Sequence, residues 1–283
     1  MVDISLQAHG KMELLKKIIR GYGSLAIAFS GGVDSTFLLK TAFDLLGDKA
    51  IAVTARSSTY PERELREAQA FAESLGIKHI IIDSEELDIP NYAENPVNRC
   101  YYCKTELFYK IKDVALRLGI RAVAEGSNAD DLNDFRPGMQ AVCELDIKSP
   151  LREADMTKQE IRQLSKEAGL PTWDKQAFAC LASRFPYGQR ITKEKLGMVD
   201  RAEQYLLDIG FRQVRVRHHG DLARIEVGTE ERARFLEQEL MEKVYAEFKR
   251  TGFTYVSLDL MGYRTGSMNE AIGKGMRQGG KDE

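Results

Sequence analysis

Short apolar runs alternate with longer amphipathic stretches along the first two thirds of the chain. Four of the runs have the length and composition of buried β-strands; they are residues 25–29, 50–54, 79–83 and 121–125. Helices are predicted in the stretches between them, over 34–46, 61–75 and 102–118. Strands and helices that alternate with short connections predict a parallel, doubly wound α/β sheet covered by helices on both faces.

The pattern changes near residue 192. Before that point, a helix is predicted over 157–168, where Thr157 and Glu160 have capping-box spacing, and a turn-rich loop is predicted over 171–191. Beyond it, the expected elements are a helix, two strands, a helix and a strand; their ranges are 193–208, 212–217, 223–227, 230–248 and 253–260. We therefore expect one domain over 1–190, a smaller α+β domain over 191–264 and a mobile tail over 265–283.

Composition narrows the class of protein. The 283 residues are 43% hydrophobic and 30% charged, with a net charge of −2 and a pI of about 6.2. These values are ordinary for a globular protein and count against a nucleic-acid partner. The sequence shows no apolar segment of signal-peptide or membrane-spanning type. We expect a cytoplasmic protein with no membrane partner.

The sequence Ser-Gly-Gly-Val-Asp-Ser at residues 30–35 directly follows the first predicted strand. Ser30, Gly31, Gly32 and Ser35 would place backbone N–H groups and hydroxyls at the start of a helix, an arrangement that binds phosphate. Asp34 would repel phosphate, so we predict that it holds Mg²⁺. No lysine stands where the common NTPase loop requires one. The loop instead resembles the pyrophosphate loop, or PP-loop, of the ATP pyrophosphatases, which cleave ATP between its α and β phosphates.

Cysteines form a second group of candidate residues. Cys100 and Cys103 make a C-x-x-C pair at the start of a predicted helix, and Cys180 lies in the loop over 171–191. Three thiolates with an open fourth position suit a [4Fe-4S] cluster. A dithiol redox pair, a zinc half-site and two core cysteines are the alternatives. Cys143 has no partner at ligand spacing, and we predict a small buried residue there.

Arg215 and Arg217 alternate along a predicted strand, so both side chains project from one face. Two guanidinium groups on one face suit a phosphate or a carboxylate. A solvated edge strand with charged residues is the alternative, and the residues alone favour it slightly. His218 and His219 are expected to be solvated or structural.

Together with the PP-loop and the C-x-x-C pair, the segment Ala-Cys-Leu-Ala-Ser-Arg-Phe-Pro-Tyr-Gly at 179–188 resembles the LarE family. These enzymes are ATP-dependent sulfur transferases that help to build the nickel-pincer nucleotide cofactor of lactate racemase. The similarity extends over nearly the whole chain, with further matching segments at 55–57, 126–128, 136–138, 149–152 and 262–269.

The resemblance implies an activity. ATP would adenylate a carboxylate of pyridinium-3,5-biscarboxylic acid mononucleotide, and sulfur would then replace AMP to give the thiocarboxylate. Members with a single cysteine at the position of Cys180 sacrifice its sulfur. Cys100 and Cys103 instead match the subgroup in which three cysteines hold a [4Fe-4S] cluster. The cluster delivers sulfide to the substrate, and its own supply is free sulfide or another sulfur donor.

The resemblance also implies site residues and assembly. It adds Ala55, Arg56, Gly126 and Asn128 to the nucleotide site, makes Asp34 and Cys180 catalytic, and assigns Arg215 and Arg217 to the substrate phosphate. A hexamer built from trimers is implied. The competing functions are [4Fe-4S]-dependent tRNA 2-thiolation, a nucleotide-binding iron–sulfur sensor without turnover and, more remotely, amidation as in the NAD synthetases.

Overall fold

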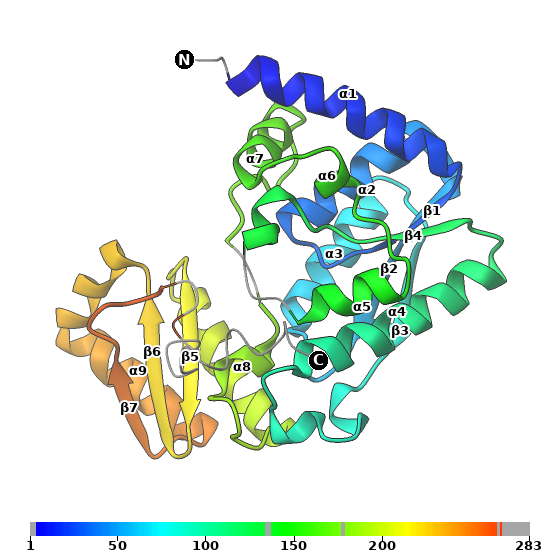
Figure 1. The fold of residues 1–283 in the computed structure, drawn as a ribbon. Helices are drawn as coiled ribbons and strands as arrows, with labels where there is room; N and C mark the ends of the chain where they lie inside the picture. The colour runs from blue at the N-terminus through cyan, green and yellow to red at the C-terminus, as the bar shows by residue number, and fades with distance from the viewer. Residues whose placement is uncertain (1–3, 134–136, 177–178, 265–266, 268–283) are drawn as a thin grey trace. The chain divides into compact units, whose positions relative to one another are not determined.

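The computed structural model describes residues 4–133, 137–176, 179–264 and 267 (Figure 1). The described residues fall into two compact units, one within the ranges 1–85 and 98–178, the other within 86–97 and 179–283. The predicted domain division after residue 190 stays a prediction. The predicted tail lies outside the described residues apart from Ser267, and so does Arg136 of the 136–138 segment.

A parallel four-stranded sheet forms the centre of the first unit, in the order β3-β2-β1-β4. Its strands are β1 (Leu25–Ala28), β2 (Ala50–Arg56), β3 (His79–Asp83) and β4 (Ala122–Ala124). Leu25 lies opposite both Ala50 of β2 and Ala122 of β4, so β1 is central. The order reverses between β1 and β4, and ligands of parallel sheets bind beyond the carboxyl ends at such a point.

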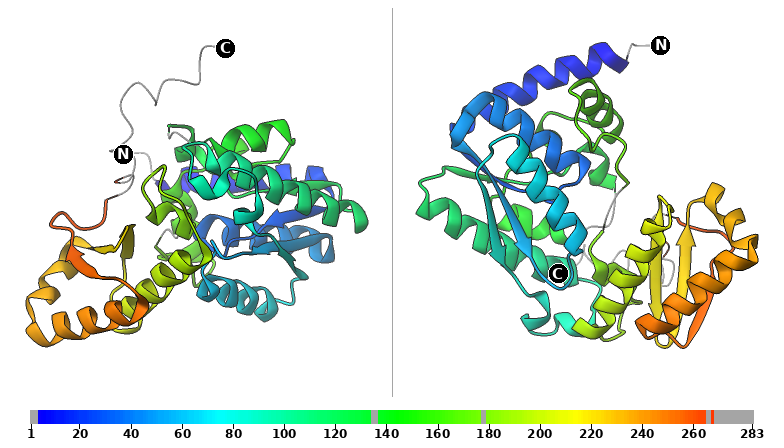
Figure 2. Two further views of the ribbon diagram at one scale, coloured as in Figure 1. Left: turned by 90° about the horizontal axis from the view of Figure 1, so that it is seen from below. Right: turned by 180° about the vertical axis from the view of Figure 1, so that it is seen from behind.

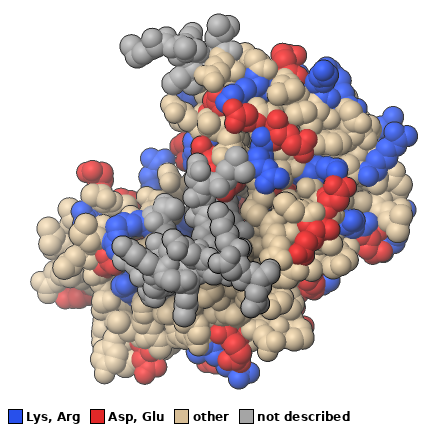
Figure 3. Space-filling view, in the orientation of Figure 1, with Lys and Arg blue, Asp and Glu red and all other residues tan. Residues whose placement is uncertain are grey.

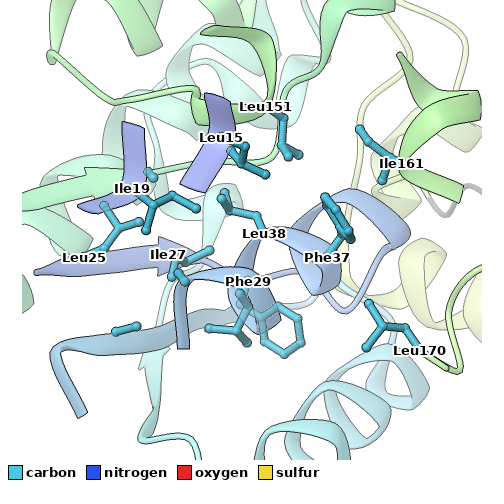
Figure 4. Close-up of a cluster of buried hydrophobic side chains, with 14 of the residues drawn as sticks. Leu15, Ile19, Leu25, Ile27, Phe29, Phe37, Leu38, Leu151, Ile161 and Leu170 are labelled. Atoms are coloured by element: carbon cyan, nitrogen blue, oxygen red, sulfur yellow. The ribbon is translucent and has the colours of Figure 1, made fainter. Parts of the chain in front are cut away.

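Helices cover both faces of this sheet, as Figures 1 and 2 show for α3 and α4. The helices of the unit are α1 (Ile4–Tyr22), α2 (Val33–Leu46), α3 (Glu62–Ser74), α4 (Arg99–Arg117), α5 (Gly138–Glu144), α6 (Pro150–Glu153) and α7 (Lys158–Glu167). One core lies between the sheet and α1, α2, α3, α6 and α7, and includes Leu15, Ile27 and Phe37 (Figure 4). A second core packs α4 and α5 against the other face.

The second unit contains a small mixed sheet in the order β5-β6-β7. Its strands are β5 (Val214–His219), β6 (Leu222–Val227) and β7 (Tyr255–Leu258), and its helices are α8 (Lys193–Asp208) and α9 (Gln238–Thr251). β5 and β6 are antiparallel, whereas β6 and β7 are parallel. The predicted fold class, a doubly wound α/β domain of the PP-loop type with a smaller α+β part, is confirmed.

Most predicted elements occur within a few residues of their expected bounds, but the helix predicted over 230–248 is confirmed only from Gln238 onward. A 3₁₀ helix occupies Thr229–Leu236, and α9 begins only at Gln238. The carboxylate of Glu231 accepts hydrogen bonds from the backbone N–H groups of Arg212 and Gln213, which lead into β5. Arg234 donates to the carbonyls of Ile209 and Gly210 after α8. These tertiary contacts hold the segment apart from α9.

None of the helices in the described part of the chain is both long enough and apolar enough to cross a membrane. The predicted cytoplasmic location stays a prediction.

Candidate active site

The turn after β1 has the geometry of an anion-binding loop. Gly31 has a φ of 61°, and a Cβ there would lie 3.3 Å from the Cβ of Ala68, so both conformation and space favour glycine. Gly32 is the N-cap of α2. The Ser35 hydroxyl lies 3.1 Å from that of Ser30 and accepts a hydrogen bond from the Ser30 N–H. Two hydroxyls and the free N–H groups of a helix start thus gather at the positive end of the helix dipole.

Two side chains from outside the motif hold the carbonyl groups of this turn. The Tyr60 hydroxyl donates to the Ser30 carbonyl at 2.8 Å, and the Lys175 ammonium donates to the Gly31 carbonyl at 3.2 Å. Burial, followed by the nearby charges of Glu64 and Glu67, raises the pKa of Tyr60, which keeps its hydroxyl a donor. These bonds fix the orientation of the peptide groups in the loop.

The carboxylate of Asp34 has two different environments. Its Oδ2 contacts the ammonium of Lys158, the first residue of α7. Its Oδ1 is buried, and no group among the described residues donates to it. Carboxylate oxygens are the ligands that Mg²⁺ prefers. A buried carboxylate oxygen without a donor, next to a phosphate loop, therefore fits the predicted magnesium site.

The loop after β4 lies directly against the start of α2. A Cβ on Gly126 would be 3.1 Å from the Ser35 nitrogen and 3.3 Å from the Asp34 Cβ, so glycine permits this close approach. The preceding residue, Glu125, is buried and accepts hydrogen bonds at 2.7 Å from the hydroxyls of Ser127 and Ser149. The next residues are fixed by Asn128, whose side-chain oxygen accepts from the Asp130 N–H. The structure thus brings Gly126 and the loop that carries Asn128 to the PP-loop.

Ala55 and Arg56 end β2, the neighbour of β1. Ala55 lies opposite Ile82 in the sheet. The Arg56 guanidinium pairs with the Asp83 carboxylate at 2.7 Å, and both side chains are largely exposed. The pair is therefore a surface ion pair at the carboxyl edge of the sheet.

Cys100 and Cys103 both lie in the first turn and a half of α4, which begins earlier than predicted, at Arg99. Residues three apart on a helix are neighbours on its surface. Neither forms a disulfide; Cys100 is exposed and Cys103 is partly exposed. One turn after Cys100, the Lys104 ammonium lies 3.6 Å from the Glu125 carboxylate. Through Glu125, the helix of the cysteine pair is connected to the loop that packs on Asp34.

Cys143 corrects one expectation, since its side chain is exposed on α5 rather than buried. It is the last but one residue of a short helix, and it follows the buried Val142, whose side chain takes the core position.

Cys180 lies in the second unit, where it is exposed and forms no disulfide. Its backbone is held by Arg184, which donates to the carbonyls of Ala179 and Cys180 at 2.8 and 3.3 Å. Arg184 forms a bidentate pair with Glu203 of α8, at 2.8 and 2.9 Å, and both side chains are almost fully buried. Burial raises the pKa of Glu203, but the charge of Arg184 outweighs this effect and brings the pKa below its ordinary value. The pair is therefore ionised.

Arg215 and Arg217 lie next to this segment. Arg217 donates to the Ser183 carbonyl at 3.1 Å and pairs with Glu226 at 2.7 Å. Arg215 lies with its guanidinium 5.2 Å from the ring centre of Tyr263. Burial, followed by the charge of Arg184, lowers the pKa of Arg215 to about 10.

The two residues are only 3% and 5% exposed, so the solvated-edge alternative for Arg215 and Arg217 is wrong. His218 is buried as well. Its ring stacks on Phe185 at 4.9 Å, and burial lowers its pKa to about 4. Of the two expectations for His218, solvated or structural, its burial fits the structural one.

No set of three or more His, Cys, Asp or Glu side chains within the described ranges is gathered closely enough to hold a metal ion. Cys100 and Cys103 belong to one unit and Cys180 to the other.

Comparisons with known proteins agree with this geometry. A family model described as NAD synthase matches residues 11–99, which include the PP-loop. A pyridinium-3,5-bisthiocarboxylic acid mononucleotide synthase of Lactiplantibacillus plantarum is 38% identical over 265 residues, covering 93% of this chain and 95% of that protein. The chain belongs to the LarE family.

This LarE-family chain is also similar to two further proteins. An uncharacterised protein of Synechocystis sp. is 47% identical over 264 residues, covering 93% of this chain and 98% of its own. Argininosuccinate synthase of Methanocaldococcus jannaschii is 30% identical over 159 residues, which span 51% of this chain and 40% of that enzyme. The predicted enzyme class, an ATP-dependent synthase that transfers sulfur, is confirmed.

Several residues of this LarE-family site could not be assigned from the sequence. Tyr60, Lys158 and Lys175 reach the PP-loop from loops and a helix start far along the chain. Glu203 is one of many charged residues in an amphipathic helix, and nothing in its spacing marks it as buried. Arg184, in contrast, stands inside the segment 179–188 that carries the family resemblance.

Proposed function

We propose that the protein converts the carboxylates of pyridinium-3,5-biscarboxylic acid mononucleotide into thiocarboxylates at the expense of ATP. The observation that carries this proposal is the PP-loop site, in a chain that matches the L. plantarum synthase over 93% of its length. The name of that synthase supplies the substrate class, and the geometry of the loop supplies the place for ATP.

ATP would bind with its phosphates at Ser30, Gly31, Gly32 and Ser35. The turn is glycine-lined and closed by the two serines, which lets N–H groups approach phosphate oxygens. Asp34 would hold Mg²⁺ through its Oδ1, the buried atom that lacks a donor among the described residues. Ala55, Arg56, Gly126 and Asn128 would complete the nucleotide site, because the first two end β2 and the other two follow β4, the strands that flank β1.

Adenylation is the first step. A carboxylate oxygen of the substrate attacks the α-phosphorus, the bond from this phosphorus to the bridging oxygen breaks, and its electron pair leaves with pyrophosphate. The products are an acyl adenylate and pyrophosphate, and no proton is transferred. Donors fixed before the reaction stabilise the charge that grows on the departing oxygens. AMP then becomes the leaving group when sulfur attacks the carbonyl carbon.

The source of sulfur is the second part of the proposal. Cys100, Cys103 and Cys180 would hold a [4Fe-4S] cluster, which when bound supplies a metal-held, deprotonated sulfide. The support is that none of the three is in a disulfide, that each is at least partly exposed, and that two of them are neighbours on one face of α4. Sacrifice of the Cys180 sulfur, as in members with a single cysteine, is the alternative.

Arg215 and Arg217 would receive the phosphate of the mononucleotide. Both arginines lie on β5 and are almost fully buried, and two guanidinium groups on one strand suit the oxygens of a phosphate. Because Arg217 and Arg184 both donate to the 179–183 backbone, a phosphate bound there would place the substrate beside Cys180. The predicted homo-oligomer stays a prediction.

The proposal is tested by measuring AMP and pyrophosphate release under anaerobic conditions with ATP, Mg²⁺ and the biscarboxylate mononucleotide. Release should require the mononucleotide, because the acyl adenylate forms only when its carboxylate attacks. Release with tRNA in its place would indicate 2-thiolation. Acidic and basic side chains are intermixed over the face shown in Figure 3, which gives no support to an RNA surface there. ATP binding without any release would indicate a sensor.

The phosphate assignment is read from the same assay with a substrate that lacks the phosphate group. The dephosphorylated nucleoside should need a concentration at least about tenfold higher for half-maximal release, since a charge-assisted hydrogen bond contributes about 1.5 kcal/mol or more. If the nucleoside and the mononucleotide reached half-maximal release at the same concentration, Arg215 and Arg217 would not bind the substrate phosphate.

A further inference from the structure

Lys158 occupies a place that helix stability does not explain. It is the first residue of α7, and a positive charge there interacts unfavourably with the positive end of the helix dipole. The helix start itself is well formed without the charge. Thr157 and Glu160 make a reciprocal capping box, and the Lys158 N–H donates to the Asp130 carboxylate at 2.8 Å. The backbone of Lys158 is therefore fixed, and its side chain serves something else.

The side chain reaches the PP-loop, 124 residues earlier in the chain, where its ammonium contacts the Oδ2 of Asp34. The loop contains no lysine of its own, unlike the common NTPase loop. Asp34 is the one partner of this ammonium in the described part of the chain. Since an ammonium has three N–H donors, two remain to be used. The side chain is also about one-third exposed, so a ligand can reach it.

Lys175, the other lysine at the loop, differs in this respect. Its ammonium is surrounded by the carboxylates of Glu64 and Glu67, at 2.7 and 2.6 Å, and by the Gly31 carbonyl. Its three donors are occupied, so its role is to hold the loop. Lys158 is the lysine with donors left for a phosphate.

Resting on the function proposed above, we propose that Lys158 alternates between two partners. Without nucleotide it neutralises Asp34 and keeps the carboxylate in place. When Mg·ATP binds, Asp34 would hold the metal, and Lys158 would turn its ammonium to the β-phosphate. In the adenylation step the electron pair of the broken bond moves to the oxygen that leaves with pyrophosphate, and the ammonium stabilises the charge on that oxygen.

This alternation predicts two opposite effects of one substitution. In Lys158→Met, Asp34 loses its competing cation, so Mn²⁺ alone should bind the nucleotide-free protein about tenfold more tightly. Inorganic pyrophosphate with Mg²⁺ should bind about 10- to 100-fold more weakly, because a charge-assisted hydrogen bond is lost. If Lys158 only supported the fold, its replacement would weaken the binding of both ligands. Mn²⁺ binding is measured by electron paramagnetic resonance, and pyrophosphate binding by calorimetry.

Lys40→Met is the matched control, since Lys40 lies on α2 and pairs on the surface with Asp44; it should change neither affinity. Lys158→Gln gives the same readout if the methionine variant does not fold. If the wild-type protein binds no pyrophosphate, the proposed function itself fails. If it does bind, and Lys158→Met binds Mn²⁺ and pyrophosphate as the wild type does, the role of Lys158 alone is overturned.

Discussion

Asp34→Asn should reduce pyrophosphate release by a factor of about 10³ or more, the largest loss expected from any single change in the first unit. The amide keeps the size of the side chain but removes the charge that would hold Mg²⁺. Asp34 is also the residue on which the PP-loop, Gly126 and Lys158 converge. The measurement is release of pyrophosphate with ATP, Mg²⁺ and the mononucleotide.

Asp44→Asn is the control for this substitution. Asp44 lies on the same helix, α2, and forms an exposed pair with Lys40, and such surface pairs contribute little to stability. The control should retain full release. If Asp34→Asn also released pyrophosphate at the wild-type rate, Asp34 would have no role in holding the metal.

Cys100→Ala should abolish the iron–sulfur cluster, which is the second large effect that we expect. With one thiolate of three removed, reconstitution under anaerobic conditions should leave almost no bound iron, whereas the wild type should bind about four irons per chain. Sulfur transfer from sulfide should be lost, while pyrophosphate release should continue. Iron content and the visible absorbance of the cluster are the measurements.

Cys143→Ala provides a matched control because Cys143 is an exposed thiol in the same unit. Iron that binds non-specifically to surface thiols would decrease in both variants. Loss in Cys100→Ala alone supports the ligand assignment, and a complete cluster in Cys100→Ala would refute it.

The sequence predicted local features well because local residues determine them. The turn at 30–35 requires glycine where φ is positive and serine where hydroxyls close the loop. The strands β1 and β2 are runs of mostly apolar residues that are buried between helices on two faces. The capping box of Thr157 and Glu160 was predictable for the same reason, since both residues belong to one helical turn.

Features that depend on residues distant in the chain could not be predicted. The pairing of Lys158 with Asp34 joins positions 124 residues apart. Arg217 is buried with its ion-pair partner Glu226 of β6, and Arg215 is buried near the charge of Glu203 of α8. The N-terminal helix α1 was not predicted either, because it contributes only a few buried side chains, among them Leu15 and Ile19, to a core that the other elements define.

The most direct test of sulfur transfer is the mass of the nucleotide product after many turnovers with sulfide, read together with the intact mass of the protein. We predict that both carboxylates of the product exchange an oxygen for sulfur and that Cys180 retains its thiol. A product that keeps all its carboxylate oxygens while ATP is consumed would contradict sulfur transfer. If instead one Cys180 lost the elements of H₂S for every sulfur atom found in the product, the cluster would not be the sulfur source.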